Sequence, residues 1–210
     1  MKRALAATAG TVLAFTMMAT GPAFADDRHH AEHHKNAHGT EETRCGGNRT
    51  SGQDREWLKS SIEGDHFEIT GGRLAQQRGV DPMTKALGAR LERDHTKSLA
   101  DAVALASALG IKPPTAMSDK QREELSQVSE QRGLHFDDAY AELEVQDHKM
   151  DIHEAQNEWE NGCNQMVRDE ANTELPVLRQ HLQLSDQTSR HIETLANHES
   201  GGRDGSSNEG

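Results

Sequence analysis

Apolar residues recur at helical spacing in four long segments, at about residues 54–79, 81–109, 135–160 and 163–198. In each segment they fall on one stripe when successive residues are advanced by about 100°. The stripes consist of Leu58, Ile62, Ile69 and Gly72; Leu87, Leu91, Ala102, Leu105 and Leu109; Tyr140, Ala141, Ile152, Ala155 and Trp159; and Val167, Ala171, Leu178, Leu182, Ile192 and Ala196. Four amphipathic helices of this length predict an all-α bundle.

Glycine and proline divide these segments. Residues 110–114 hold one glycine and two prolines, which end the second helix, and Gly162 ends the third. The long connection between the second and third helices contains a shorter helix, from an N-capping Ser118 to about Arg132. Pro176 lies inside the fourth helix and predicts a kink there.

The first 25 residues have the pattern of a cleavable signal peptide. Lys2 and Arg3 precede an apolar run over residues 4–19, and Gly21-Pro22 then breaks the helix before a small-residue cleavage pattern that ends at Ala25. We therefore expect a secreted or extracytoplasmic protein. Residues 26–52 predict a flexible, His-rich leader, residues 53–199 the helical domain and residues 200–210 a disordered tail.

The net charge of the chain limits the classes of partner that are expected to bind. Because the predicted signal peptide contains two basic residues and no acid, 21 of the 23 basic residues and all 35 acidic residues remain, a formal charge of −14. Such a surface repels phosphate, so neither nucleic acid nor anionic lipid is expected to bind. No later segment has the length and hydropathy of a membrane span. A protein partner is not indicated.

Polar residues interrupt the apolar stripes of all four helices. These candidate metal ligands are Asp65, Glu68, Asp94, His95, Glu144, His148, Glu174 and His181. Counting from the turns places Asp65 level with Asp94, and His148 level with Glu174. Buried carboxylates need cations, protons or metal, so a divalent transition metal (Fe, Zn, Cu or Mn) is one hypothesis. A polar network satisfied without metal is another, and a wrong helical phase that leaves these residues exposed is a third.

The predicted leader carries a second set of imidazoles. Neutral imidazole binds Ni, Cu and Zn, so this set could deliver or buffer metal for the domain. The alternative is an unstructured polar linker that binds metal only as any histidine cluster does. The set consists of His29, His30, His33, His34 and His38.

Short motifs in the four helices resemble a known family. They are Glu68-Ile69-x-x-Gly72-x-Leu74-Ala75, Asp94-His95, Phe136-Asp137-x-x-Tyr140 followed by His148, and Leu175-Pro176-x-Leu178-x-x-His181. Together they resemble the secreted bacterial family called domain of unknown function 4142 (DUF4142), over about residues 54–196. The resemblance implies a ferritin-like four-helix bundle with an extracytoplasmic location, and no established reaction.

The chain departs from the ferritin-like di-iron pattern, in which two of the four helices each supply a Glu-x-x-His pair. Glu92 and His95 have that spacing, but Glu92 falls on the flank of its helix, and the fourth helix has no such inward pair. An oxidase activity is therefore disfavoured, and no catalytic residue is predicted.

Gly71 and Gly72 lie within a helix and are interpreted as a close-packing point.

The resemblance also bears on the two cysteines. In a simple up-down-up-down bundle Cys45 and Cys163 would lie at opposite ends. With a long crossover between the second and third helices, as in ferritin-like folds, both come to the same end. We therefore predict a Cys45–Cys163 disulfide, which an oxidising compartment would favour. The alternatives are an unpaired Cys45 or an intermolecular link.

Three hypotheses for function follow. The first is a metal-binding or metal-storing bundle, and the second is a non-enzymatic envelope or interaction protein whose buried polar network is only structural. The third is a small oxidoreductase, which the incomplete di-iron motif disfavours.

Overall fold

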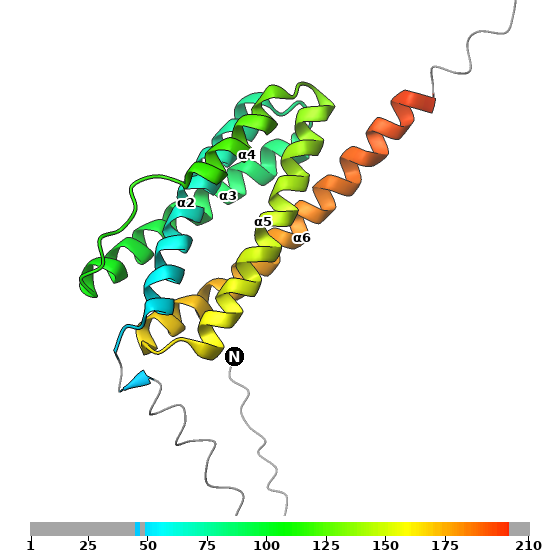
Figure 1. Cartoon of the computed structure of the whole chain (residues 1–210). Coiled ribbons are helices and arrows are strands. Elements are labelled where there is room, and N and C mark those ends of the chain that lie inside the picture. Colours follow the sequence, from blue (N-terminus) through cyan, green and yellow to red (C-terminus); the bar gives the residue numbers. More distant parts are fainter. Residues whose placement is uncertain (1–44, 47–48, 202–210) are drawn as a thin grey trace, which may run out of the picture. The chain divides into compact units, whose positions relative to one another are not determined.

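The computed structural model describes residues 45–46 and 49–201, with side chains described as far as residue 198. This part of the chain is all-α, as predicted, and contains no strand (Figure 1). Its helices are α2 (Gly52–Arg78), α3 (Pro82–Ala108), α4 (Asp119–Glu130), α5 (Leu134–Asn161) and α6 (Gln165–Gly201). The predicted signal peptide and most of the predicted leader and tail lie outside the described residues.

Local capping signals set where the helices begin. Ser51 and Asp54 form a reciprocal capping box at the start of α2, and Ser118 and Gln121 form another at α4. Asp81 caps α3 by accepting a hydrogen bond from the Met83 backbone. The N-cap predicted at Ser118 is therefore confirmed. α6 continues through Pro176.

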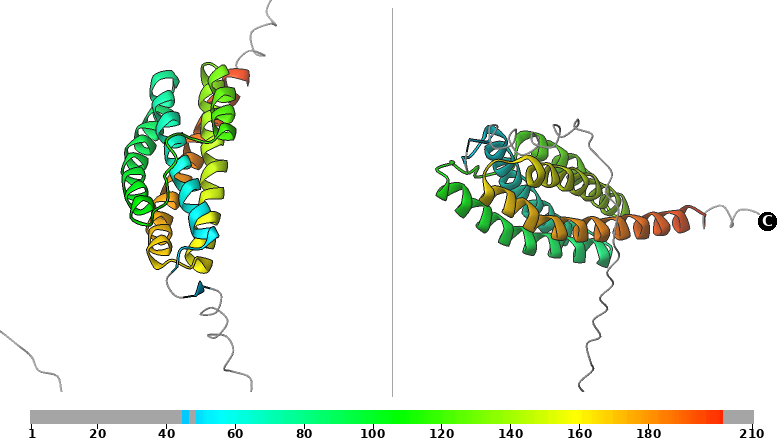
Figure 2. Two further views of the ribbon diagram at one scale, coloured as in Figure 1. Left: turned by 60° about the vertical axis from the view of Figure 1, so that its left-hand side comes forward. Right: turned by 90° about the horizontal axis from the view of Figure 1, so that it is seen from below.

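The long helices form two antiparallel hairpins, α2–α3 and α5–α6, which pack against each other (Figures 1 and 2). The backbone of Val80 and Asp81, between α2 and α3, donates hydrogen bonds to Asp137 near the start of α5. At the other end, Gln53 donates to Glu158 near the end of α5. α5 therefore runs opposite to α2 and in the same direction as α3. The long connection contains α4, which contacts α2 and α5.

Two apolar clusters fill the interior. The base cluster includes Trp57, Leu58, Ile62, Ala102, Ala106, Ile111, Ala155, Val167, Ala171, Leu175 and Leu178, and the far cluster includes Ala75, Leu87, Leu91, Val128, Phe136 and Tyr140. Most predicted stripe residues are buried or half-buried; Ala196 is exposed, because the last turns of α6 extend past the other helices (Figure 2). Along each long helix, buried polar residues separate the two clusters.

α2 and α3 approach each other closely at a pair of glycines. A Cβ atom added to Gly72 would lie 2.5 Å from the Gly88 carbonyl oxygen, and one added to Gly88 would lie 2.6 Å from the Gly72 carbonyl oxygen. The close-packing interpretation is confirmed for Gly72. At Gly71 an added Cβ would make only ordinary contacts, 3.5 Å or longer.

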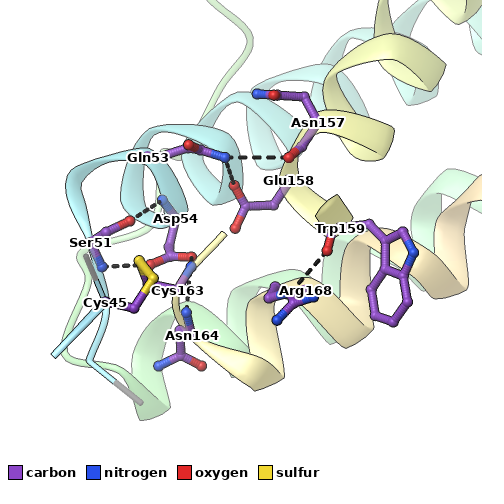
Figure 3. Close-up of a disulfide and its surroundings, with 10 residues drawn as sticks. All are labelled: Cys45, Ser51, Gln53, Asp54, Asn157, Glu158, Trp159, Cys163, Asn164 and Arg168. Atoms are coloured by element: carbon purple, nitrogen blue, oxygen red, sulfur yellow. Dashed lines mark hydrogen bonds between the residues drawn. A yellow bond between two sulfur atoms is a disulfide. The ribbon is translucent and has the colours of Figure 1, made fainter. Parts of the chain in front are cut away.

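The predicted disulfide is confirmed at the base of the domain. Cys45 and Cys163 are bonded, with their Cα atoms 5.1 Å apart (Figure 3). Beside the bond, the Asp54 carboxylate accepts hydrogen bonds from the backbone of Cys163 and Asn164, at 2.8 and 3.1 Å. The start of α2 and the loop between α5 and α6 are thus joined covalently and by hydrogen bonds.

Among the described helices, none is both long enough and apolar enough to cross a membrane.

Candidate metal centre

Three histidines meet between the two apolar clusters, one each from α3, α5 and α6. They are His95, His148 and His181, and all three are buried. Their ring centroids are 5.9 Å apart for His95 and His148, 5.2 Å for His95 and His181, and 5.3 Å for His148 and His181. One nitrogen from each ring lies within 4.8 Å of the others. This spacing allows one ion to contact all three rings.

One nitrogen of each ring is already held by the protein. His95 Nδ1 lies 2.8 Å from Asp65 Oδ1, and His181 Nε2 lies 2.9 Å from Asp94 Oδ2. His148 Nδ1 donates to the backbone oxygen of Glu144 at 2.8 Å. Such contacts fix the orientation of metal-binding histidines in known sites.

The other three nitrogens are the ones left for a metal. His95 Nε2, His148 Nε2 and His181 Nδ1 are buried and have no hydrogen-bonding partner in the described part of the chain. Burial lowers the pKa of His95 and His181 to about 4 and that of His148 well below its usual value, so all three rings are neutral near pH 7. Neutral imidazole offers the lone pair that metal coordination requires.

A pair of buried carboxyl groups lies beside His148. Glu68 on α2 and Glu144 on α5 come within 4.8 Å of each other and of His148, whose Nδ1 lies 3.6 Å from Glu68 and 3.7 Å from Glu144; their carboxyl oxygens have no hydrogen-bonding partner in the described part of the chain. Burial, together with the Glu144 carboxylate, raises the pKa of Glu68 well above its usual value, and burial raises the pKa of Glu144 to about 8. The pair therefore holds protons or a cation. His148 Nδ1 already donates to the Glu144 backbone oxygen. We therefore assign His148 to the three-histidine group and not to the glutamate pair.

Asp94 is neutralised by arginine. Its carboxylate pairs with Arg90 and, at 3.1 Å, with Arg93 as well as contacting His181. Although burial alone would raise it, the pKa of Asp94 is lowered by the hydrogen bond with His181 and by Arg90. Asp94 thus supports the ring of His181. Glu92 lies on the flank of α3 as predicted, where it pairs with Arg73 at 2.7 Å.

Glu174 lies apart from the three histidines. Its carboxylate accepts hydrogen bonds from Ser61 and Ser98, at 3.2 and 3.1 Å. His181, and not Glu174, reaches His148. Counting from Gly162 placed Glu174 level with His148. Because α6 begins only at Gln165, three residues later, Glu174 lies at a different height along the helices.

Two further acids on α5 were missed by the sequence reasoning. Asp147 is buried with one oxygen lacking a partner, and Asp151 lines a pocket next to the histidines. Both have helical spacing from Glu144, at three and seven residues, so the periodicity could have found them. The leader histidines His29, His30, His33, His34 and His38 lie outside the described residues.

The pKa values of these groups give stability a defined pH dependence. Burial raises the pKa of Asp65, Glu144 and Glu174 to about 8. Their stabilising contribution is complete below the unfolded pKa values, 3.8 for Asp and 4.5 for Glu, and is lost as the pH rises to about 8. His95 and His181 act in the opposite direction, but only between about pH 4 and 6.5. Between pH 6.5 and 8, the change of stability with pH therefore comes from the carboxyl groups.

We therefore expect the metal-free protein to become less stable from pH 6.5 to pH 8. The free energy of unfolding should fall by about 1.4 kcal/mol per pH unit for each proton that the folded state retains. Urea unfolding at a series of pH values measures this slope. Glu174→Gln removes one of these retained protons, so its slope should be smaller by about 1.4 kcal/mol per pH unit. A slope that is zero or of opposite sign would show that these carboxyl groups are ionised in the folded protein.

Comparison with known proteins gives a family and a similar fold. The family described as "Domain of unknown function (DUF4142)" matches residues 39–188. The crystal structure of a DUF305 fragment from Deinococcus radiodurans is similar with a TM-score of 0.60 and 9% identity, over 68% of this chain and 99% of that chain. At this identity the likeness concerns the fold alone. No curated protein matches the chain. Since the family match spans more than half of the sequence, this protein belongs to the DUF4142 family.

Proposed function

We propose that this protein is an exported metal-binding protein that holds a transition-metal ion with His95, His148 and His181. The observation that carries the proposal is the set of three buried, neutral imidazole nitrogens without protein partners, each on a ring whose other nitrogen is fixed. Leaving such groups unpaired in a protein interior costs free energy, which a bound cation would recover.

The donor set favours particular metals. Among Fe, Zn, Cu and Mn, three imidazoles favour Zn²⁺ and Cu²⁺, whereas Mn²⁺ prefers oxygen ligands. Three histidines leave at least one coordination position for another ligand, as in many zinc sites that also bind water. Asp65 and Asp94 would act on the metal only through the histidines that they hold.

We further propose a ferritin-like four-helix bundle formed by α2, α3, α5 and α6, with α4 in the crossover. The parallel direction of α3 and α5 supports this fold. Export is supported by the signal-like first 25 residues and by the disulfide, since such bonds persist in oxidising compartments. The leader histidines are proposed as an accessory metal-binding segment.

The alternative is a structural polar network in an envelope or interaction protein. The contacts of His95 with Asp65 and of His181 with Asp94 favour it, because they would fix the packing without metal. This alternative gives no partner to the free nitrogens of the three rings.

Elemental analysis after metal loading and dialysis tests the proposal. To isolate the domain, the five leader histidines are replaced by glutamine in every variant. We expect about one zinc or copper ion per chain, lost in His95→Ala/His148→Ala. The matched control is His153→Ala, which removes an exposed imidazole from α5 five residues beyond His148 and should retain the metal. The absence of retained metal in the parent protein would refute metal binding and support the structural network.

A further inference from the structure

A pocket of about 500 Å³ lies beside the three histidines, between α2, α3, α5 and α6. His95 and His181 form part of its wall, together with Asp65, whereas His148 does not line it. The pocket thus gives access from one side to two of the three proposed ligands. Its size is typical of a small-ligand site.

The pocket wall carries an excess of uncompensated acid. Its three cationic side chains are engaged: Arg90 and Arg93 pair with Asp94, and Lys97 pairs with Asp101. Four further acids of the wall form no ion pair within the described part of the chain; they are Asp151, Glu154, Glu170 and Glu174. Burial raises the pKa of Glu174 to about 8 and that of Glu170 above its usual value, so the pocket concentrates cations near the histidines most strongly above about pH 8.

The spacing of these acids suits a hydrated ion more than a bare one. Among the described residues, no three of them bring carboxylate oxygens within 4.8 Å of one another. A hydrated divalent cation is larger and can be held by carboxylates through its own water molecules. Independently of the acidic cluster, buried Asp65 has one oxygen without a partner, and His95 and His181 each have a free nitrogen in the same wall.

We infer that this pocket admits and transiently holds a hydrated divalent metal cation, with Glu170 and Glu174 as its carboxylate acceptors, before the ion passes to His95 and His181. This inference rests on the proposed function. The two glutamates are on one face of α6, one helical turn apart, and Glu174 is oriented by the hydroxyls of Ser61 and Ser98. They steer the cation but are not ligands of the final site.

The rate of Co²⁺ loading tests this inference, because Co²⁺ bound by nitrogen ligands absorbs visible light. Stopped-flow mixing gives a second-order rate, and titration gives the final stoichiometry, in the protein with substituted leader histidines. At about pH 9, where Glu174 is ionised, Glu170→Gln/Glu174→Gln should slow loading about tenfold at low salt, and far less at high salt where charges are screened. The final spectrum and stoichiometry should be unchanged. Glu142→Gln, an exposed acid of α5 outside this pocket, is the matched control and should load at the parent rate.

A second variant tests the pocket by volume instead of charge. Gly64 lines the pocket, and a Cβ atom added there meets nothing within 4 Å. Gly64→Leu should therefore fill part of the pocket and slow loading at low and high salt alike, and circular dichroism checks that it folds. Parent rates in both variants would overturn the inference while leaving metal binding intact. No Co²⁺ spectrum in the parent protein would instead refute the proposed function, and this inference with it.

Discussion

Replacing both cysteines by serine is expected to lower the free energy of unfolding by about 2–5 kcal/mol. The Cys45–Cys163 bond closes a loop with a sequence separation of 118 residues, so its loss frees a large part of the unfolded chain. The hydrogen bonds from the Cys163 and Asn164 backbone to Asp54 remain, so the variant should still fold. Urea unfolding monitored by circular dichroism measures the difference.

Reductant supplies the control for this prediction. The parent protein treated with reductant should lose the same stability as Cys45→Ser/Cys163→Ser loses without it. The variant itself should be insensitive to reductant. If reduction leaves the parent protein equally stable, the bond contributes nothing to the domain, and the hydrogen bonds at the base suffice.

Gly88→Ala is expected to cost about 2–3 kcal/mol, even though alanine favours helix by about 1 kcal/mol. The added methyl group would lie 2.6 Å from the Gly72 carbonyl oxygen and 2.8 Å from the Ala75 Cβ. Backbone atoms cannot rotate away as a flexible side chain can, so α2 and α3 must separate. Equilibrium unfolding of the metal-free protein measures the loss.

Gly64→Ala is the matched control, because it has the same chemistry in α2 but open space around the new methyl group. It should stabilise the protein by about 0.5–1 kcal/mol through helix propensity and reduced unfolded-state entropy. Destabilisation of similar size at both positions would mean that interhelical contact is not the cause. Neutral behaviour of Gly88→Ala would show that the helix pair can separate at little cost.

The helices were predictable because their signals are local. Ser118 marked the start of α4, and the apolar spacing around Leu58 and Ile62 marked the inward face of α2. The Cys45–Cys163 bond was a different case, since the two cysteines are distant in sequence. Its prediction depended on the crossover implied by the family resemblance, because no local pattern states which ends of the helices meet.

The candidate site was predictable in its residues and less so in its arrangement. Helical phase placed His148 and His181 on inward faces and His95 beside the stripe of its helix, and all three are buried in the structure. Their level along the long helices depends on where each helix begins, and the later start of α6 moved Glu174 away from His148. The pocket, formed by side chains from four helices, has no signature in any single segment.

The three histidines divide unequally between the hairpins: His95 belongs to α2–α3, and His148 and His181 to α5–α6. An ion bound by all three would therefore cross-link the hairpins, as the disulfide does at the base. By linkage, each tenfold rise in free metal concentration above the dissociation constant would raise the free energy of separating the two hairpins by about 1.4 kcal/mol. Hairpin separation would in turn release the ion, so proteolysis of this protein would slow as the metal supply increases.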